Sequence, residues 1–374
     1  MNTSFMTDIV KRYASFGWHR TGWAQMDQCA EWLRCLLQEQ GAAVDFLPFD
    51  YPFFKSVVNS ERGTSPGSVE MLYFCWTGET IISNPMISGI DIAGSDTEIS
   101  DTLNALTGRA QLQGNDGLIL STDSSVAGLC GINRKEGAGL DFPTVLASPE
   151  FRKEISKAPI PLHCQASIET RRSECIRAIF QGPNPEYPLV VTTPVSGWFE
   201  CAGERAAGLA IAITVAREMS KTRTVHLLLA QGHEIGSLGG YQMNTIYQGA
   251  SLSGVLHIGS CVGNTDADLV AVCSAPSPNY NEISEALLQL DLVPEIPKDP
   301  SNPEFWLGEA QCWASNEYPM LSIAGQTKLF HTQADLPDAA TNGQSLATAA
   351  HCLLNAAKSL TRFPSGQHTN KMPA

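Results

Sequence analysis

The chain has 374 residues, of which 43% are hydrophobic, so it is long and apolar enough to bury a sizeable core as one large α/β domain or as two domains. Its formal net charge of −14 argues against nucleic-acid binding, because that binding depends on Lys and Arg side chains that neutralise phosphates. No apolar run reaches the roughly 18 to 20 residues that span a bilayer, and the N-terminus has no basic segment before an apolar one, so we expect a soluble, cytoplasmic protein with no membrane or nucleic-acid partner.

The N-terminal part predicts a helix followed by a strand. From Trp23 to Gln40 the apolar residues recur at intervals of three and four, which is the helical period, and Gly41 ends the helix. The run from Ala43 to Phe49 alternates as strands do. Prolines and a Ser/Gly-rich stretch follow, so we expect a domain boundary near residue 60.

Residues 61–170 predict a small β-rich inserted domain. Short strand-like runs cover Glu70 to Trp76, Leu118 to Ser121 and Thr144 to Ala147, and clusters of Gly, Asn, Asp and Ser separate them. We therefore expect residues 1–60 and 171–374 to form the main domain, interrupted by this insert.

After the insert, strand-like and helix-like segments alternate to the end of the chain. Such alternation is typical of βαβ units, in which helices cover both faces of a mostly parallel sheet. We therefore predict an α/β fold of this kind for the main domain. The expected strands are 174–180, 189–193, 224–230, 254–258 and 320–323, and the expected helices are 206–219, 239–248, 280–290 and 341–360.

Polar residues gather directly after the predicted strands, where ligands bind in open parallel sheets. A hydroxyl, an indole, a thiol, a carboxylate and a guanidinium follow strand 189–193 within one strand-to-helix turn, a mixture that folding alone rarely needs. The next strand ends at a His-Glu pair. The candidate site residues are Ser196, Trp198, Cys201, Glu204, Arg205, His233, Glu234, His257, Glu309 and His331.

The order and spacing of these segments resemble the M28 aminopeptidase family over roughly the last 200 residues. Segment 222–229, followed by Gly-His-Glu-Ile-Gly at 232–236, looks like that family's strand and paired glutamates. His331-Thr-Gln-Ala-Asp335 resembles its terminal His-Thr-x-x-Asp, and Glu309 to Pro319 is similar to a loop that borders the family's substrate pocket. The insert resembles the protease-associated insert of many members.

The resemblance implies a zinc hydrolase, but several of the family's metal-binding residues are replaced here. In that family two zinc ions bridged by an Asp are held by His, Glu, Asp and His, while a second Glu activates the bridging water. Only Glu234 and His331 match ligand positions. The bridging Asp falls at about Gly203, and His233 stands at the position of the catalytic Glu. Two dications need anionic ligands to offset their repulsion, so these replacements argue against a standard two-zinc site.

A single zinc or other divalent ion is one interpretation of this centre. Glu234 and His331 would hold the ion, together with His257 or Glu204, and an open position would take water or substrate. An imidazole near its ordinary pKa acts as a general base at neutral pH, so His233 and Glu234 are the candidate catalytic residues.

A metal-free pocket is the second interpretation. Arg205 would bind a carboxylate of the ligand through two parallel hydrogen bonds, with Trp198 as a pocket wall. A third hypothesis is nucleophilic chemistry by Cys201 or Cys261, if a histidine lies within hydrogen-bond reach. The eleven cysteines include no CxxC pair, however, so we expect most of them to be reduced core thiols.

The leading hypothesis is therefore an M28-like hydrolase that cleaves an amide or peptide bond of a small substrate at an altered, single-metal centre. The alternative is an inactive protein of the same fold that recognises a peptide or small carboxylate through Arg205 and Trp198. The candidate substrate-binding residues are Ser196, Trp198, Cys201, Glu204, Arg205 and Glu309. Whether the protein is an enzyme, and what its oligomeric state is, stay open at this point.

Overall fold

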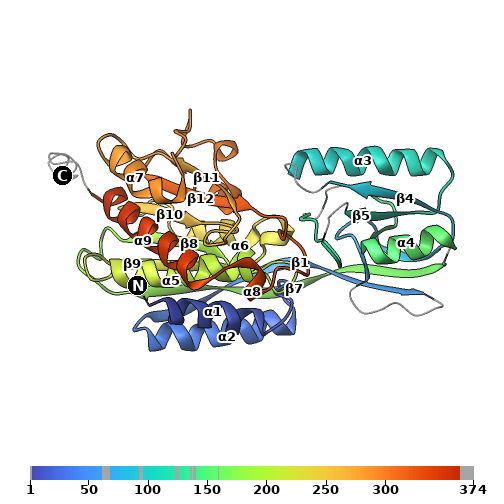
Figure 1. Cartoon of the computed structure of the whole chain (residues 1–374), viewed down its shortest axis with the longest axis horizontal. Helices are drawn as coiled ribbons and strands as arrows, with labels where there is room; N and C mark the ends of the chain where they lie inside the picture. The colour runs from blue at the N-terminus through green and yellow to red at the C-terminus, as the bar shows by residue number, and fades with distance from the viewer. Residues whose placement is uncertain are drawn as a thin grey trace.

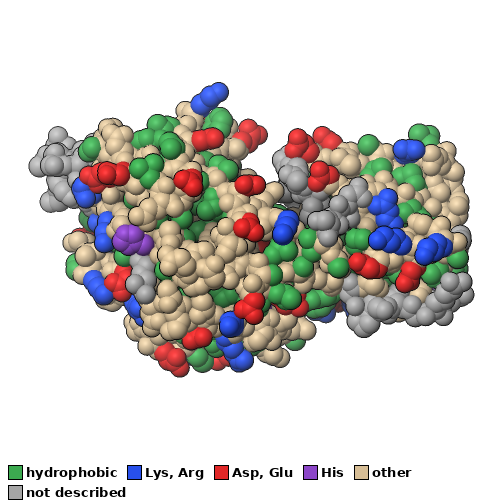
Figure 2. Space-filling view, viewed as in Figure 1, with side chains coloured by type: hydrophobic (Ala, Val, Ile, Leu, Met, Phe, Trp, Pro, Cys, Tyr) green, Lys and Arg blue, Asp and Glu red, His purple; other side chains and the backbone are tan. Residues whose placement is uncertain are grey.

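The computed structural model describes residues 2–60, 68–91, 96–122, 126–134, 137, 140–158 and 160–362, and it shows a molecule with two parts (Figure 1). The larger part is built on an eight-stranded sheet, and the smaller part on a four-stranded sheet. Figure 2 shows a notch between the two parts, with acidic side chains on both of its rims.

Four neighbouring strands of the larger sheet are parallel, as the alternation of strands and helices predicts. In spatial order they are β9 (Val225–Ala230), β8 (Leu189–Pro194), β10 (Gly254–Ile258) and β12 (Met320–Gln326). Antiparallel strands flank them: β11 (Asp268–Cys273) beside β12, β7 (Leu162–Phe180) beside β9, and both β1 (Ala43–Ser60) and β3 (Gly78–Ile82) beside β7.

Helices pack against both faces of the larger sheet. One core contains side chains of α1 (Thr3–Ala14), α2 (Ala24–Glu39), α5 (Ala207–Met219), α7 (Asn279–Leu287) and α9 (Gly343–Leu360). A second core contains side chains of α6 (Leu238–Thr245) and of the 3-10 turn Gly308–Trp313.

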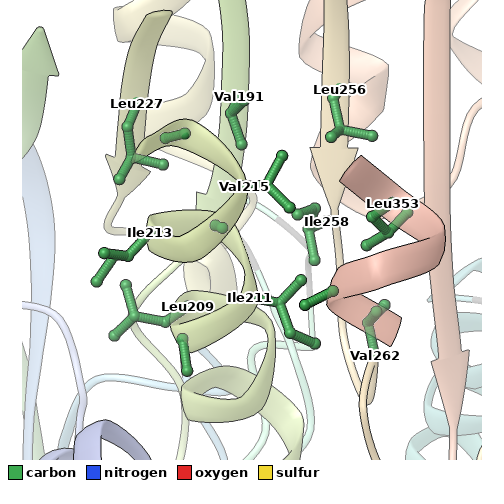
Figure 3. Close-up of a cluster of buried hydrophobic side chains, with 14 of the residues drawn as sticks. Val191, Leu209, Ile211, Ile213, Val215, Leu227, Leu256, Ile258, Val262 and Leu353 are labelled. Atoms are coloured by element: carbon green, nitrogen blue, oxygen red, sulfur yellow. The ribbon is translucent and has the colours of Figure 1, made fainter. Parts of the chain in front are cut away.

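Alternate residues of the parallel strands enter these two cores. Val191 and Leu227 pack with α5 in the first core, while Val190 and Leu228 belong to the second. Because both faces are covered, every residue of β8 is buried, which is why these strands read as continuous apolar runs. Figure 3 shows Ile211 and Val215 of α5 on the side of that helix that faces Ile258 of β10 and Leu353 of α9. Each fully buried aliphatic side chain contributes about 1.5–3 kcal/mol to stability.

The two longest strands, β1 and β7, pair with each other from Ala43↔Ile179 to Ser60↔Leu162 and run from the larger part into the smaller one (Figure 1). The sequence predicts only their ends inside the larger sheet, because Pro48 and Pro52 read as breaks. Both prolines fit within β1 because β1 is an edge strand of the described sheet and residues four apart present their nitrogens to the same side.

The smaller part contains the sheet β2 (Val69–Met71), β6 (Thr144–Ala147), β5 (Gly117–Thr122) and β4 (Pro85–Ile90). The expected strand 70–76 is wrong beyond Met71, since Phe74 has a left-handed φ of 52°. Two helices, α3 (Asp96–Leu112) and α4 (Pro149–Lys157), were not predicted. Most of the Ser/Gly-rich stretch lies outside the described residues, and domain boundaries at 60 and 171 stay a prediction.

None of the described helices combines the length and the apolar character that crossing a bilayer requires. The apolar residues of the longest of them, such as Leu346 and Leu353 of α9, are buried in the protein core instead.

Candidate functional site

The loops after the parallel strands meet at one end of the larger sheet, as the topology predicts. Ser196, after β8, bonds to Glu234, after β9. Glu204, also after β8, contacts His331, after β12. We call this group the strand-end cluster, and its members are Ser196, Glu204, Arg205, His233, Glu234, His257, Glu309 and His331.

A buried ion pair between Glu204 and Arg205 lies in this cluster. A single π-helical turn, Ala202–Ala206, precedes α5 and carries both residues, and such turns are frequent at functional sites. Nη2 of Arg205 lies 2.7 Å from Oε1 of Glu204, and each side chain is only 1% exposed. Nε of Arg205 donates to the Ser196 carbonyl at 2.8 Å. The predicted binding of a ligand carboxylate by Arg205 is therefore blocked, because the guanidinium already contacts oxygens of Glu204 and Ser196.

His331 approaches the same carboxylate from the loop after β12. Its Nε2 lies 3.4 Å from Oε1 of Glu204, and its backbone N–H donates to Oε2 at 3.2 Å. Burial by itself raises the pKa of Glu204, but the Arg205 guanidinium and the His331 imidazole together outweigh burial and hold this pKa well below its usual range.

Asp335, the last residue of the His-Thr-x-x-Asp segment, fixes the π-helical turn. Its two carboxyl oxygens accept the backbone N–H groups of Gly203 at 2.8 Å and Glu204 at 2.9 Å. Burial raises the pKa of Asp335 to about 7, although both N–H groups act in the opposite direction. This residue therefore serves the geometry of Glu204.

Four residues of the strand-end loops other than glycine have left-handed backbones. The φ angles are 48° at Cys201, 58° at Ser237, 60° at Cys261 and 57° at His331. Such conformations cost about 1–3 kcal/mol each for residues other than glycine, and they gather at functional sites. The strain supports a functional origin for this end of the sheet.

Glu234 joins separate segments of the chain. Its Oε1 accepts the backbone N–H of Thr21 at 2.6 Å, and its Oε2 accepts the Ser196 hydroxyl at 2.7 Å. The backbone carbonyl of Glu234 accepts the N–H of Arg134, which belongs to the smaller part. Ser196 Oγ also accepts the N–H of Gly232 at 2.9 Å. Both residues thus have partners inside the protein, and neither presents an open binding surface.

His233 and Glu309 form a close contact of a different kind. Nδ1 of His233 lies 3.3 Å from Oε1 of Glu309. Burial, assisted by the positive charge of Arg205, lowers the pKa of His233 to about 3, whereas burial raises the pKa of Glu309 to about 8. At neutral pH both groups are therefore uncharged, so an imidazole meets a carboxylic acid here. The His233 side chain keeps 14% of its surface exposed and Glu309 none.

His257 reaches the cluster from β10. Its Nδ1 lies 2.9 Å from the hydroxyl of Ser322, its register partner on β12. Burial, followed by the proximity of His233 and Arg205, lowers the pKa of His257 to about 3. Among the described residues no hydrogen-bond partner is found for its buried Nε2.

Trp198 and the two cysteines do not line an open pocket. Trp198 is 1% exposed, and its indole N–H donates to Oδ1 of Asn133 at 2.8 Å. Burial, followed by the charge of Glu204, raises the pKa values of Cys201 and Cys261 well above the ordinary thiol value. Both sulfurs are therefore protonated at neutral pH, which argues against the hypothesis of a cysteine nucleophile.

Sequence reasoning missed the N-terminal segment that enters the site. Arg20 is buried, donates to both carboxylate oxygens of Glu70 in the smaller part, and lies 5.0 Å from the centre of the Trp198 ring. The next residue, Thr21, is the partner of Glu234. The dense mixture of aromatic and polar residues from Trp18 to Trp23 was the available signal.

A segment of the smaller part, residues 129–134, covers the strand-end cluster. The N–H of Gly131 donates to the His331 carbonyl at 2.8 Å, and the N–H of Gln333 donates to the Leu129 carbonyl at 3.3 Å. A Cβ atom at Gly131 would lie 2.1 Å from the Trp198 indole, so only glycine allows this approach. The insert therefore takes part in closing the site.

The residues present do not fit a metal ion in this arrangement. In the described part of the chain no group of three or more His, Cys, Asp or Glu side chains is placed to hold one. The predicted set of Glu234, His331 and either His257 or Glu204 is not assembled, because Glu234 and Glu204 already bind protein donors. A guanidinium inside the cluster would also repel a second cation.

Comparison with known proteins gives the fold. No protein-family model and no curated protein sequence matches the chain. Among solved structures, a peptidase M28 precursor from Shewanella amazonensis SB2B is 15% identical with a TM-score of 0.74, over 99% of this chain and 96% of that protein. The zinc aminopeptidase BSAP from Bacillus subtilis is 12% identical with a TM-score of 0.70, over 95% and 93%.

A glutaminyl cyclase from Porphyromonas gingivalis is 11% identical with a TM-score of 0.53, over 96% of this chain and 98% of that protein. At such low identities the likeness shows the fold. The chain has the α/β fold of M28 peptidases and zinc aminopeptidases, which confirms the predicted fold class and the predicted resemblance.

Proposed function

We propose that the protein recognises a small polar ligand, such as the end of a peptide or an amino-acid derivative, at the strand-end cluster without a bound metal. One observation carries this proposal. Among the described residues, Nε2 of His257, Nδ1 of His233 and both carboxyl oxygens of Glu309 are buried and make no hydrogen bond, although Nδ1 of His233 and Oε1 of Glu309 lie 3.3 Å from each other. Native proteins pair more than about 90% of their buried polar groups, so several unpaired atoms in one cluster indicate a ligand position.

Recognition is favoured over metal-assisted hydrolysis. An efficient general base has a pKa near the working pH, but burial lowers the pKa of His233 to about 3, which makes it a weak base. Glu234 is held by Thr21 and Ser196 and is not directed at an open position. The cluster thus offers hydrogen bonds more readily than proton transfer.

Hydrolysis of an amide bond is the second candidate, and the contact between His233 and Glu309 favours it. A catalytic base is commonly oriented by a third group, and Glu309 stands 3.3 Å from Nδ1 of His233. His233 is also the cluster residue with a marked solvent exposure, 14% of its side chain. The M28 peptidases that share the fold support amide chemistry as the reaction to test.

The test combines metal analysis, ligand screening and product analysis on the purified full chain. We expect no stoichiometric metal, and a rise in melting temperature with at least one dipeptide, amino-acid amide or amino acid, unaffected by chelation. Prolonged incubation should give no product. Turnover that is lost after chelation would restore the metal hydrolase, and turnover that resists chelation but is lost in His233→Ala would establish the second candidate. No stabilisation by any member of the panel would contradict recognition.

A further inference from the structure

The strand-end cluster contains a permanent positive charge. The Arg205 guanidinium is 1% exposed, and it is held by Oε1 of Glu204 at 2.7 Å and by the Ser196 carbonyl at 2.8 Å. A guanidinium stays protonated in proteins, and its planar fork fixes the oxygens that it binds. A buried charge persists only when it is paired, so the position of Arg205 depends on Glu204.

The groups around this guanidinium are the types that bind zinc. Oε1 of Glu204 is shared between Arg205 and Nε2 of His331, which lies 3.4 Å away. The sulfur of Cys201 lies 3.8 Å from Oε2 of the same carboxylate. Carboxylate, imidazole and thiolate are the usual zinc ligands. The cluster therefore contains residue types that bind zinc, but its carboxylate binds an arginine, and in the described part of the chain no three of these side chains are placed to hold an ion.

The backbone around Glu204 is also fixed independently of Arg205. Asp335 binds the N–H groups of Gly203 and Glu204, and the N–H of His331 binds Oε2 of Glu204. These bonds keep the carboxylate in place when the guanidinium is removed, and stacking on Phe330, with ring centroids 3.8 Å apart, positions the His331 imidazole. A cation of another kind could then occupy the same space.

We propose that the Arg205 guanidinium is the built-in cation of this centre and takes the place of a divalent ion at the Glu204 carboxylate, which His331 also contacts. The inference rests on the metal-free centre of the proposed function and names the residue that makes the centre metal-free. Because a side chain cannot dissociate, the charge balance of the site is independent of metal supply. Removing the guanidinium should convert the cluster into a zinc site.

The experiment compares the wild-type chain with Arg205→Ala, Arg205→Lys and the double variant Arg205→Ala/Glu204→Gln. Each protein is incubated with zinc, desalted and analysed for metal, and its melting temperature is measured with and without zinc. We expect about one zinc per chain and a rise of at least about 3 °C only for Arg205→Ala. Arg205→Lys keeps a cation, and the double variant lacks the anion, so neither should bind zinc.

Each outcome decides between the alternatives. If Arg205→Ala is recovered only when refolded with zinc, the proposal is supported. If it folds and binds no zinc, or fails to fold with zinc present while the double variant folds, the proposal is refuted. Zinc in the wild-type chain would overturn both this inference and the metal-free function. If the wild type binds no ligand while Arg205→Ala binds zinc, only the proposed function would be contradicted, and the inference about Arg205 would stand.

Discussion

Glu309→Gln tests whether a buried, uncharged carboxylic acid lies beside His233. The pKa of Glu309 rises from 4.5 to about 8 on burial in the folded chain, so folding favours its protonated form. The contribution of the protonated Glu309 carboxyl to the free energy of unfolding is fully present below about pH 4.5 and is lost as the pH rises to about 8. The difference between 4.5 and 8, at about 1.36 kcal/mol per pH unit, corresponds to at most about 5 kcal/mol.

The assay is urea unfolding of the wild type and Glu309→Gln at several values from pH 5 to pH 9. Groups that titrate in both proteins cancel, so the free energy of unfolding of the wild type relative to the variant should fall by several kcal/mol across this range and level off above pH 8. Glu304→Gln, at an exposed carboxylate of the neighbouring turn, is the control and should follow the wild type. Parallel curves for wild type and Glu309→Gln would refute the assignment of a neutral buried acid.

Three further predictions concern packing and charge. Arg20→Met leaves the partly buried carboxylate of Glu70 uncompensated and should lower the free energy of unfolding by about 3–5 kcal/mol in urea denaturation. A loss under about 1 kcal/mol would mean that water already solvates the pair. Gly131→Ala should lower the free energy of unfolding by about 1–3 kcal/mol because its Cβ would overlap the Trp198 indole. The control Gly108→Ala, which has open space around it in α3, should raise this free energy by up to about 1 kcal/mol. Equal melting temperatures for the two variants would count against the close approach of Gly131 to Trp198. Iodoacetamide should label the exposed Cys35 in the native chain but not Cys201 before unfolding, as peptide mass spectrometry can show.

Most of the larger sheet could be predicted because its pattern is local. The parallel strands are continuous apolar runs between turn residues, and their ends agree with the structure to within one residue for Gly254–Ile258 and Leu189–Pro194. Helix α3 was missed although Ile99, Leu103 and Ala110 recur at helical spacing. The surrounding polar residues obscured that signal, and burial against the smaller sheet is what selects the helix.

The location of the candidate site could be predicted from the sequence, but the hydrogen-bond partners of its residues could not. Loops that follow parallel strands must meet at one edge, so the convergence of Ser196, Glu234 and His331 follows from topology. The hydrogen-bond partners of these residues do not follow from topology. The group that binds Glu234, for example, is the backbone N–H of Thr21, which no side-chain pattern in the sequence indicates. Arg205 shows the same limit, since the same residue type serves a ligand or a neighbouring carboxylate, and burial decides between them.

Because residues 129–134 of the insert cover the strand-end cluster, the insert cannot be deleted without disturbing the larger part. Trp198 and Phe199, from the larger part, lie in one continuous apolar core with Leu118, Leu120 and Leu146 of the smaller part. A truncated chain without the insert would expose these aromatic rings to water and lose the hydrogen bonds at His331 and Glu234. The insert and the larger part therefore share one apolar core, and removal of the insert should cause the remaining protein to aggregate.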